Sequence, residues 1–404
     1  MPSKSAFPFL LIYMFLAMLG IGLVIPILPD LLKEFGADGK AAGYLVSAFG
    51  LTQFLFSPIA GDYSDKYGRK PMIVVGLCLF AISNLVAATA GHFSLLVVAR
   101  LIGGMGSAAL VPSIMAYIVD ITTEQQRARA MSFLGASMSS GFIIGPGLGG
   151  LLAEFGTRAP FFVSASIGLL AVICCILLLP ESQSVEVRLM RLKSKPKREN
   201  IFRQLVQSVR SRYFILLLMI FALTFGLTHF EAISPLFVTQ SYGFTTREIS
   251  IMFMVCSLIG TFNQLMLTNR LTQRFGEKPI VSSMLLLSAV SLVFLLFSGN
   301  FFYVIIVTML FFTFNNILRP TINTLLSKEA GDEQGFVAGL NNAYMSLGQI
   351  FGPVLAGLLF DIDINLPYLF GAFVLLVSTF VAVKWLRSKN VEINQENKVL
   401  NVSK

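Results

Sequence analysis

Long apolar runs alternate with short polar segments along the whole chain. A helix that spans a membrane needs about 20 mostly apolar residues, and twelve runs reach roughly that length. Six lie in the first half, at 7–29, 41–60, 72–90, 93–119, 130–153 and 160–179. Six follow in the second half, at 213–240, 249–269, 280–298, 301–326, 335–360 and 367–386. The pattern predicts an all-α membrane protein with twelve transmembrane helices.

A charged segment between the second and third runs recurs 208 residues further on. The two copies are 61–71 and 269–279, and six of their eleven positions carry identical or chemically similar residues. A repeat at half the chain length indicates two related membrane halves, an arrangement that secondary transporters use. The predicted division is a six-helix half at 1–179, a basic cytoplasmic linker at 180–212, a six-helix half at 213–387 and a cytoplasmic tail at 388–404.

Composition supports a membrane protein, and the charge distribution indicates its orientation. Hydrophobic residues make up 55% of the chain and charged residues 13%. The net charge is +9, and 24 of the 30 Lys and Arg lie in the amino terminus, the even-to-odd loops and the tail. Basic residues remain on the cytoplasmic side, so both termini are predicted to be cytoplasmic. The excess charge therefore reflects topology, and no nucleic-acid partner is expected.

The sequence offers no set of residues for enzymatic chemistry or for a cofactor. Its four cysteines lie in apolar runs without the spacing of metal ligands, so they are expected to be packing residues. No phosphate-binding loop of the GxxxxGK[ST] type occurs, which argues against transport driven by ATP. We predict a protein that is not an enzyme, holds no metal or cofactor, and works with the lipid bilayer and small molecules.

Glu231 is the acid that lies well inside an apolar run. A carboxyl group in lipid is costly to ionise, so it can bind and release a proton near neutral pH. Proton carriage is one interpretation, and a permanent ion pair with a buried arginine such as Arg319 is the other. His229 is two residues away and would point elsewhere on a helix. It is interpreted as a packing residue, with assistance to the proton path left open.

Arg100 and Arg319 also lie inside apolar runs. A guanidinium has no neutral form at working pH, so each must either pair permanently or present its charge to a water-filled cavity. The small residues that follow Arg100 would permit close approach of another helix.

The fifth run carries five glycines and a proline in ten residues: Gly141, Gly145, Pro146, Gly147, Gly149 and Gly150. In a membrane bundle such a segment allows a close helix crossing and a kink. The second half repeats it 207 residues later with Gly348, Gly352 and Pro353.

Over its whole length the chain resembles the major facilitator superfamily, specifically the twelve-helix drug/proton antiporters. Asp65, Gly68 and Arg69 occupy the characteristic positions of that superfamily's loop between helices 2 and 3. The resemblance implies that Asp65 faces the start of helix 11 and that Arg69 pairs with Asp120, forming a latch on the cytoplasmic side. The 141–150 segment matches the antiporter motif GxxxGPxxGG, which importers of the superfamily generally lack.

Three segments, at 20–29, 140–147 and 338–342, resemble more narrowly the NorA-type quinolone and multidrug exporters of Gram-positive bacteria. That likeness implies a substrate cavity around Glu231, to which we assign Arg100, Asn316 and Arg319 as well. The cavity residues that it implies are Ile25, Phe49, Gln53, Met138, Phe142, Asn342 and Tyr344. Asn316 stands where such exporters can carry a second acid, which leaves Glu231 as the main candidate for proton coupling.

The sequence therefore predicts a monomeric, proton-coupled antiporter in a bacterial cell membrane. It would export amphipathic aromatic drugs, such as fluoroquinolones and cationic dyes, by alternating access. The alternatives are a proton-coupled importer or exporter of one metabolite, a narrower tetracycline-type exporter, and a membrane sensor or enzyme. The glycine motif argues against the importer, and the absence of a signalling domain or catalytic set argues against the last.

Overall fold

The computed structural model describes residues 6–184, 186, 188, 190 and 201–402, and each regular element in this part is a helix. Eleven of the described helices are long and apolar enough to cross a membrane, and α1 (Ala6–Gly22) is a shorter apolar helix. The predicted all-α membrane fold is confirmed. The middle of the predicted linker, 191–200, and the chain ends at 1–5 and 403–404 lie outside the described residues.

The first half differs from the prediction at its first run. After α1 come α2 (Leu28–Glu34), α3 (Gly39–Tyr67), α4 (Arg69–Ala88), α5 (Phe93–Ile121), α6 (Glu124–Ala153) and α7 (Ala159–Leu178). The run at 7–29 is thus not one helix, because a turn at 23–27 separates α1 from α2. Pro26 lies in that turn and Pro29 in the first turn of α2, where a missing N–H costs no helical hydrogen bond.

The second half begins with a short helix, α9 (Ile201–Ser208), inside the predicted linker. The others are α10 (Phe214–Tyr242), α11 (Thr246–Phe275), α12 (Glu277–Phe294), α13 (Phe301–Ala330), α14 (Gln334–Phe360) and α15 (Leu366–Val402). A 3₁₀ turn at Gly331–Glu333 precedes α14. Most helices extend beyond the apolar runs that predict them, because backbone hydrogen bonding continues where the side chains become polar.

The chain forms two compact units that do not follow the sequence halves. Unit 1 takes Met1–Arg198, Glu231–Ser257 and Gln349–Ile364, and unit 2 takes Glu199–Phe230, Leu258–Gly348 and Asn365–Lys404. Helices α10, α11 and α14 therefore contribute a segment to each unit. The division into halves at 1–179 and 213–387 rests on the sequence repeat and stays a prediction.

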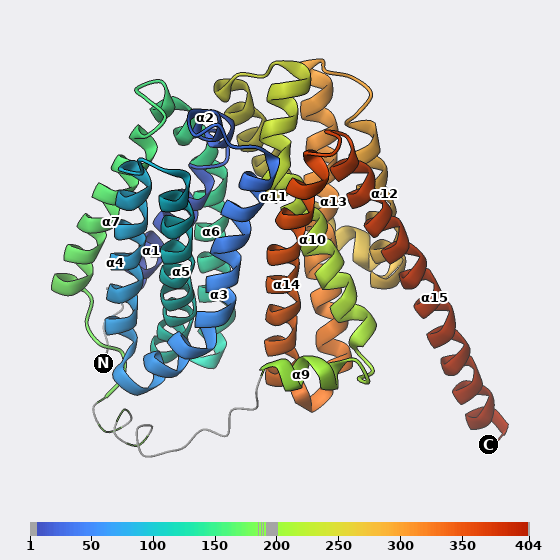
Figure 1. The fold of residues 1–404 in the computed structure, drawn as a ribbon. Coiled ribbons are helices and arrows are strands. Elements are labelled where there is room, and N and C mark those ends of the chain that lie inside the picture. The colour runs from blue at the N-terminus through green and yellow to red at the C-terminus, as the bar shows by residue number, and fades with distance from the viewer. Residues whose placement is uncertain (1–5, 185, 187, 189, 191–200, 403–404) are drawn as a thin grey trace. The chain divides into compact units, whose positions relative to one another are not determined.

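Unit 1 is built from helices that lie side by side (Figure 1). Helix α5 packs on both α3 and α4, α4 also packs on α7, and α1 packs on α6. Leu10, Met14, Ile73, Ile114 and Tyr117 are fully buried in its core. These side chains come from α1, α4 and α5, and Leu134 of α6 joins them, so the core holds both α4, which follows the charged loop, and α6, which carries the glycine motif.

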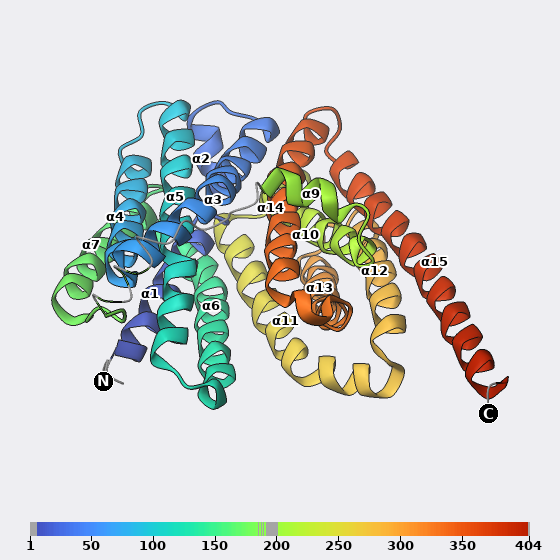
Figure 2. The same ribbon diagram turned by 90° about the horizontal axis from the view of Figure 1, so that it is seen from below.

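Unit 2 is arranged around α13, which Figure 2 shows among α10, α11, α12 and α14. The rings of Phe230 on α10 and Phe311 on α13 are 4.8 Å apart. Asn263 Nδ2 on α11 donates to Thr313 Oγ1 on α13 at 3.0 Å. Helix α13 is thus held by aromatic packing on one side and by a polar bond on another.

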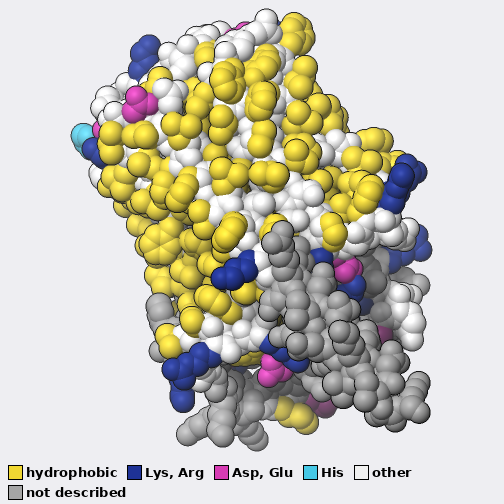
Figure 3. All heavy atoms as spheres, turned by 90° about the vertical axis from the view of Figure 1, so that its right-hand side faces the viewer, with side chains coloured by type: hydrophobic (Ala, Val, Ile, Leu, Met, Phe, Trp, Pro, Cys, Tyr) yellow, Lys and Arg dark blue, Asp and Glu magenta, His cyan; other side chains and the backbone are white. Residues whose placement is uncertain are grey.

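The outer face of unit 2 is apolar over most of its described surface (Figure 3). Helix α15, which packs on α12, exposes Phe373 and Phe380, and α12 exposes Phe294. Exposed apolar side chains on this scale are incompatible with water and fit contact with lipid.

Candidate functional site

The charged loop between α3 and α4 forms a network around Arg69, whose side chain is 7% exposed. Its Nη1 lies 2.7 Å from Asp65 Oδ1 and donates to Ser64 Oγ at 3.1 Å. Its Nε donates to Asp120 Oδ2 on α5 at 3.1 Å. The guanidinium therefore ties α3, α4 and α5 together, and the pairing with Asp120 is present. The position of Asp65 relative to helix 11 and the latch function stay predictions.

Glu181, which the sequence places in the predicted linker, is a fourth charged member of this network. Its carboxylate accepts hydrogen bonds from the backbone N–H of Arg69 at 2.9 Å and of Lys70 at 3.1 Å. These two amides are at the start of α4 and have no acceptor inside the helix. The Glu181 carboxylate therefore caps α4, and its negative charge interacts favourably with the positive end of the helix dipole. Gly68 has φ +112° and lies against this carboxylate, where a Cβ would collide.

We expect Glu181→Ala to lower the transport rate as much as Arg69→Ala does, without weakening drug binding. Both changes release the same loop, through a loss of about 1–3 kcal/mol in charge-assisted hydrogen bonds. The measurements are turnover in proteoliposomes and equilibrium drug binding in detergent. Glu186→Ala, an exposed acid five residues further on, is the matched control and should change neither. Because the two residues share one network, the double variant should be no worse than either single one.

Three glycines of α6 lie against the backbone of α1. A Cβ at Gly145 would stand 2.8 Å from the Leu19 carbonyl oxygen and 2.9 Å from Gly22 Cα. A Cβ at Gly141, one turn earlier, would meet the Phe15 carbonyl oxygen of α1 as closely, and one at Gly149, one turn later, would meet the backbone of Leu23 directly after α1. Side chains at these positions would clash with main chain that cannot move aside, so the predicted close crossing is present.

The remaining members of the glycine motif make other contacts within unit 1. A Cβ at Gly147 would lie 2.7 Å from Met254 Sδ on α11, and Gly150 lies against Ser250 of the same helix. Pro146 packs on α1, since its Cδ is 2.9 Å from where Gly22 would place a Cβ. The motif therefore brings α6 close to both α1 and α11.

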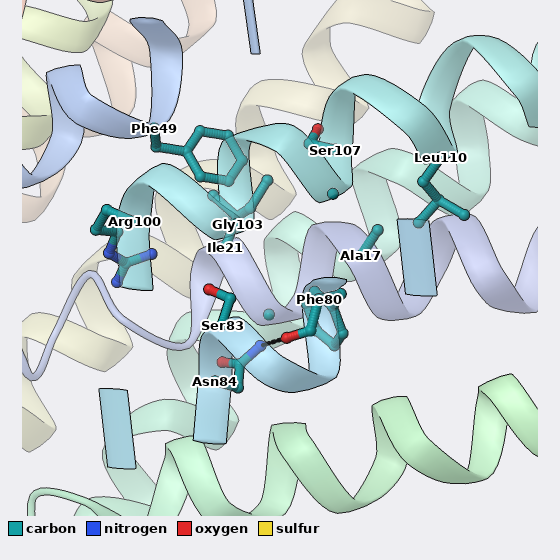
Figure 4. A pocket seen from close by; sticks show the side chains of 12 residues that line it. Ala17, Ile21, Phe49, Phe80, Ser83, Asn84, Arg100, Gly103, Ser107 and Leu110 are labelled. Atoms are coloured by element: carbon teal, nitrogen blue, oxygen red, sulfur yellow. Dashed lines mark hydrogen bonds between the residues drawn. The ribbon is translucent and has the colours of Figure 1, made fainter. Parts of the chain in front are cut away.

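A small cavity in unit 1 lies among α1, α3, α4 and α5 (Figure 4). Its polar lining includes Arg100, Ser83, Asn84 and Ser107, and the ring of Phe49 lines it as well. It leaves about 30 Å³ for the centres of water-sized groups, enough for about two waters and too little for a drug. No carboxylate among the described residues pairs with Arg100, which favours the interpretation that its charge faces a cavity.

The other cavity residues predicted in the first half lie around this site. Gln53 Nε2 donates to Ser107 Oγ at 3.2 Å, so it supports the cavity wall. Ile25 lies in the turn between α1 and α2, while Met138 packs on the buried core. The Phe142 carbonyl faces α1. The structure thus brings Phe49 and Arg100 together with Gln53 beside them, and spreads the rest over the α1–α2 turn and α6.

In unit 2 the predicted cavity residues are divided between a buried contact and exposed positions. Tyr344 is buried, and its hydroxyl is 2.8 Å from Ser208 Oγ of α9. The Asn316 amide nitrogen lies 2.6 Å from where a Cβ on Gly260 would stand, so it packs on α11. Asn342 and Arg319 are exposed, and Arg319 Nη2 donates to Met345 Sδ at 3.5 Å. The substrate role of these residues stays a prediction.

Glu231 is half-buried on α10, four residues before Pro235. Because Pro235 has no N–H, it cannot donate the usual hydrogen bond to the preceding turn, which weakens the helix at this turn. Helix α10 also passes from unit 2 to unit 1 between Phe230 and Glu231. His229, in contrast, is buried with Nε2 2.7 Å from the Pro367 carbonyl oxygen and stacks on Phe225. His229 therefore has a packing role.

The chain is similar in sequence to known proteins along nearly its whole length. The profile of the Major Facilitator Superfamily matches residues 10–269 and 264–400. Multidrug resistance protein 2 of Bacillus subtilis is 39% identical over 388 residues, covering 96% of this chain and 97% of that protein. Quinolone resistance protein NorA of Staphylococcus aureus is 35% identical over 354 residues, covering 87% and 89%.

Solved structures share the fold at lower identity. The nucleoside transporter NupG superimposes with a TM-score of 0.73 at 16% identity, covering 95% of this chain and 99% of that one. The human organic anion transporter MFSD10 gives a TM-score of 0.66 at 21% identity, covering 95% and 100%. At such identities the likeness concerns the fold alone.

Proposed function

Since the chain belongs to the Major Facilitator Superfamily, we propose that it is a proton-coupled antiporter that exports amphipathic aromatic drugs from the cytoplasm by alternating access. The observation that carries the proposal is 35–41% identity, over 87% or more of the chain, to proteins named for multidrug or quinolone resistance. The substrates proposed are fluoroquinolones and cationic dyes. A metabolite transporter and a narrower tetracycline-type exporter are the alternatives.

The close packing of α6 on α1 supports export over import. In the antiporters that the chain resembles, the same glycine motif distinguishes exporters from importers. Here Gly141, Gly145 and Gly149 carry the crossing. Where two helices touch through their backbones, neither can shift independently without a clash. A change of this crossing between transporter states therefore requires α1 and α6 to move together.

Glu231 is the proposed coupling residue because it is an acid inside a membrane span, one turn before the internal proline of α10. Protonation from outside and release inside would favour opposite states of the transporter, which is the differential affinity that a driven conformational change requires. Pro235 lies one turn after that charge, where the helix has one hydrogen bond fewer and can bend more easily.

The proposed location is a bacterial cell membrane, with both termini in the cytoplasm. The basic residues support this orientation, because 24 of 30 lie on one side by the topology of the spans. It places the Arg69 loop inside the cell and the α2–α3 and α14–α15 connections outside. The transporter is proposed to act as a monomer.

An efflux panel tests the function. Cells or proteoliposomes containing the full chain are loaded with ethidium, norfloxacin or tetracycline, and efflux is followed before and after collapse of the proton gradient. Loss of ethidium and norfloxacin efflux on collapse is the expected result. Efflux of tetracycline alone would instead support the narrower exporter, and drug efflux that survives collapse would contradict proton coupling.

A further inference from the structure

We propose that Asp361 is a reversible latch that holds α3 and α14 together at the extracellular end of unit 1. The proposal rests on the proposed orientation, which puts this end of α3 outside the cell. Residues Gly39 and Tyr67 are the two ends of that helix, and at 1.5 Å per residue they are roughly 42 Å apart. The latch is therefore separate from the Arg69 network on the other side of the membrane.

The Asp361 carboxylate caps a helix to which it does not belong. It follows the last residue of α14, and its Oδ1 accepts from the Gly39 backbone N–H at 2.9 Å. Its Oδ2 accepts from the Lys40 N–H at 3.2 Å and lies 3.5 Å from Lys40 Nζ. The side chain is only 14% exposed, so these bonds are partly shielded from water.

The start of α3 is satisfied by two carboxylates together. Asp38, the ordinary N-cap, accepts from the Ala41 N–H at 3.4 Å. Asp361 accepts from the N–H groups of Gly39 and Lys40, the two residues before Ala41. Each of the first three N–H groups of α3 therefore has a side-chain acceptor. Because helix N-termini favour negative charge, separation of α14 would leave two donors and a positive helix end for water to solvate.

Below the carboxylate, the two helices touch through their backbones. Gly43 lies against the Pro353 carbonyl, and Gly357 lies against the backbone of Gly39. Ser47 Oγ donates to the Ile350 carbonyl oxygen at 2.7 Å. By the sequence repeat α3 belongs to the first half and α14 to the second, so Asp361 joins the halves. Opening of this end during alternating access must break its bonds.

The repeat supplies a matched control. Glu154 stands 207 positions before Asp361, at the C-cap of α6 in the first half. It is exposed, and among the described residues its carboxylate has no hydrogen bond or ion pair. Glu154 thus places a carboxylate at the equivalent helix end without capping another helix. Glu154→Gln therefore removes a surface charge without removing the latch.

Distance measurements on the full chain test the latch. Spin labels are placed through Lys33→Cys and Ile362→Cys, both exposed, in a background lacking the four native cysteines, and the protein is studied in nanodiscs without drug. We expect Asp361→Ala to raise the ratio of separated to closed populations by about fivefold, the effect of losing a helix cap. Asp361→Asn should give a smaller shift, because the carbonyl oxygen of the asparagine side chain can still accept a hydrogen bond from one backbone N–H. Glu154→Gln should give none.

An Asp361→Ala distribution identical to wild type overturns the proposal, as does an equal shift in Glu154→Gln. A lowered unfolding temperature with unchanged distances likewise overturns it, since that is a purely structural role. If the alanine variant does not accumulate, Asp361→Asn decides by the same readout. The distance measurements require neither drug nor proton gradient, so they test the latch independently of the efflux panel.

Discussion

Glu231→Gln should abolish proton-driven drug efflux while the protein still folds and inserts. An amide has nearly the shape of the carboxyl group but cannot exchange a proton, so the two states lose the difference in charge that drives them. We expect ethidium efflux in energised vesicles to fall by about a hundredfold or more, the effect of removing an essential proton-transfer group. Equilibrium ethidium binding in detergent should fall much less.

Glu231→Asp is the conservative control. It keeps a titratable group one methylene shorter, so part of the gradient-driven efflux should return. Wild-type drug accumulation against an imposed pH gradient by the glutamine variant would exclude Glu231 as the coupling residue. Equal inactivity of the aspartate and glutamine variants would point to a structural acid, such as the ion pair with an arginine that the sequence leaves open.

Gly145→Leu should trap or inactivate the transporter. A Cβ at this position would already be 2.8 Å from the Leu19 carbonyl oxygen, and a full leucine has no flexible neighbour to displace. Overpacking of this kind costs typically about 1–3 kcal/mol, and more where the obstacle is backbone. Cysteine-accessibility labelling from both sides should find one accessible state instead of two, with transport lost.

Gly135→Leu is the matched control on the same helix. Gly135 is exposed and a Cβ there meets nothing within 4 Å, so the added leucine should face open surface and leave transport intact. Normal alternating accessibility in Gly145→Leu would show that the glycine is tolerated there and not required. Loss of function in both variants would instead indicate that α6 does not accept leucine at all.

The prediction of membrane-spanning elements succeeded because lipid imposes a local rule on the chain. Every backbone group in the bilayer must bond within its own helix, so a long apolar run identifies a span without knowledge of its neighbours. Hydrophobicity does not reveal the break between α1 and α2, because the residues of the turn that precedes Pro29 are themselves apolar. Local signals also indicated the α6 crossing, since closely spaced glycines have few other uses within a transmembrane helix.

Only the tertiary structure decided which distant groups meet. In a sequence, Glu181 and Asp361 are ordinary acids beside apolar runs, yet each caps a helix more than 100 residues away in the chain. Tyr344, whose substrate role stays a prediction, bonds through its hydroxyl to Ser208 of a helix within the predicted linker, a contact between residues 136 positions apart. The sequence by itself determined the spans, the repeat and the residues that can bear charge in lipid, because these follow from local chemistry. Packing decided which groups these residues contact. A carboxylate that caps a helix and one that is solvated cannot be distinguished in the sequence, because they differ only after the helices have assembled.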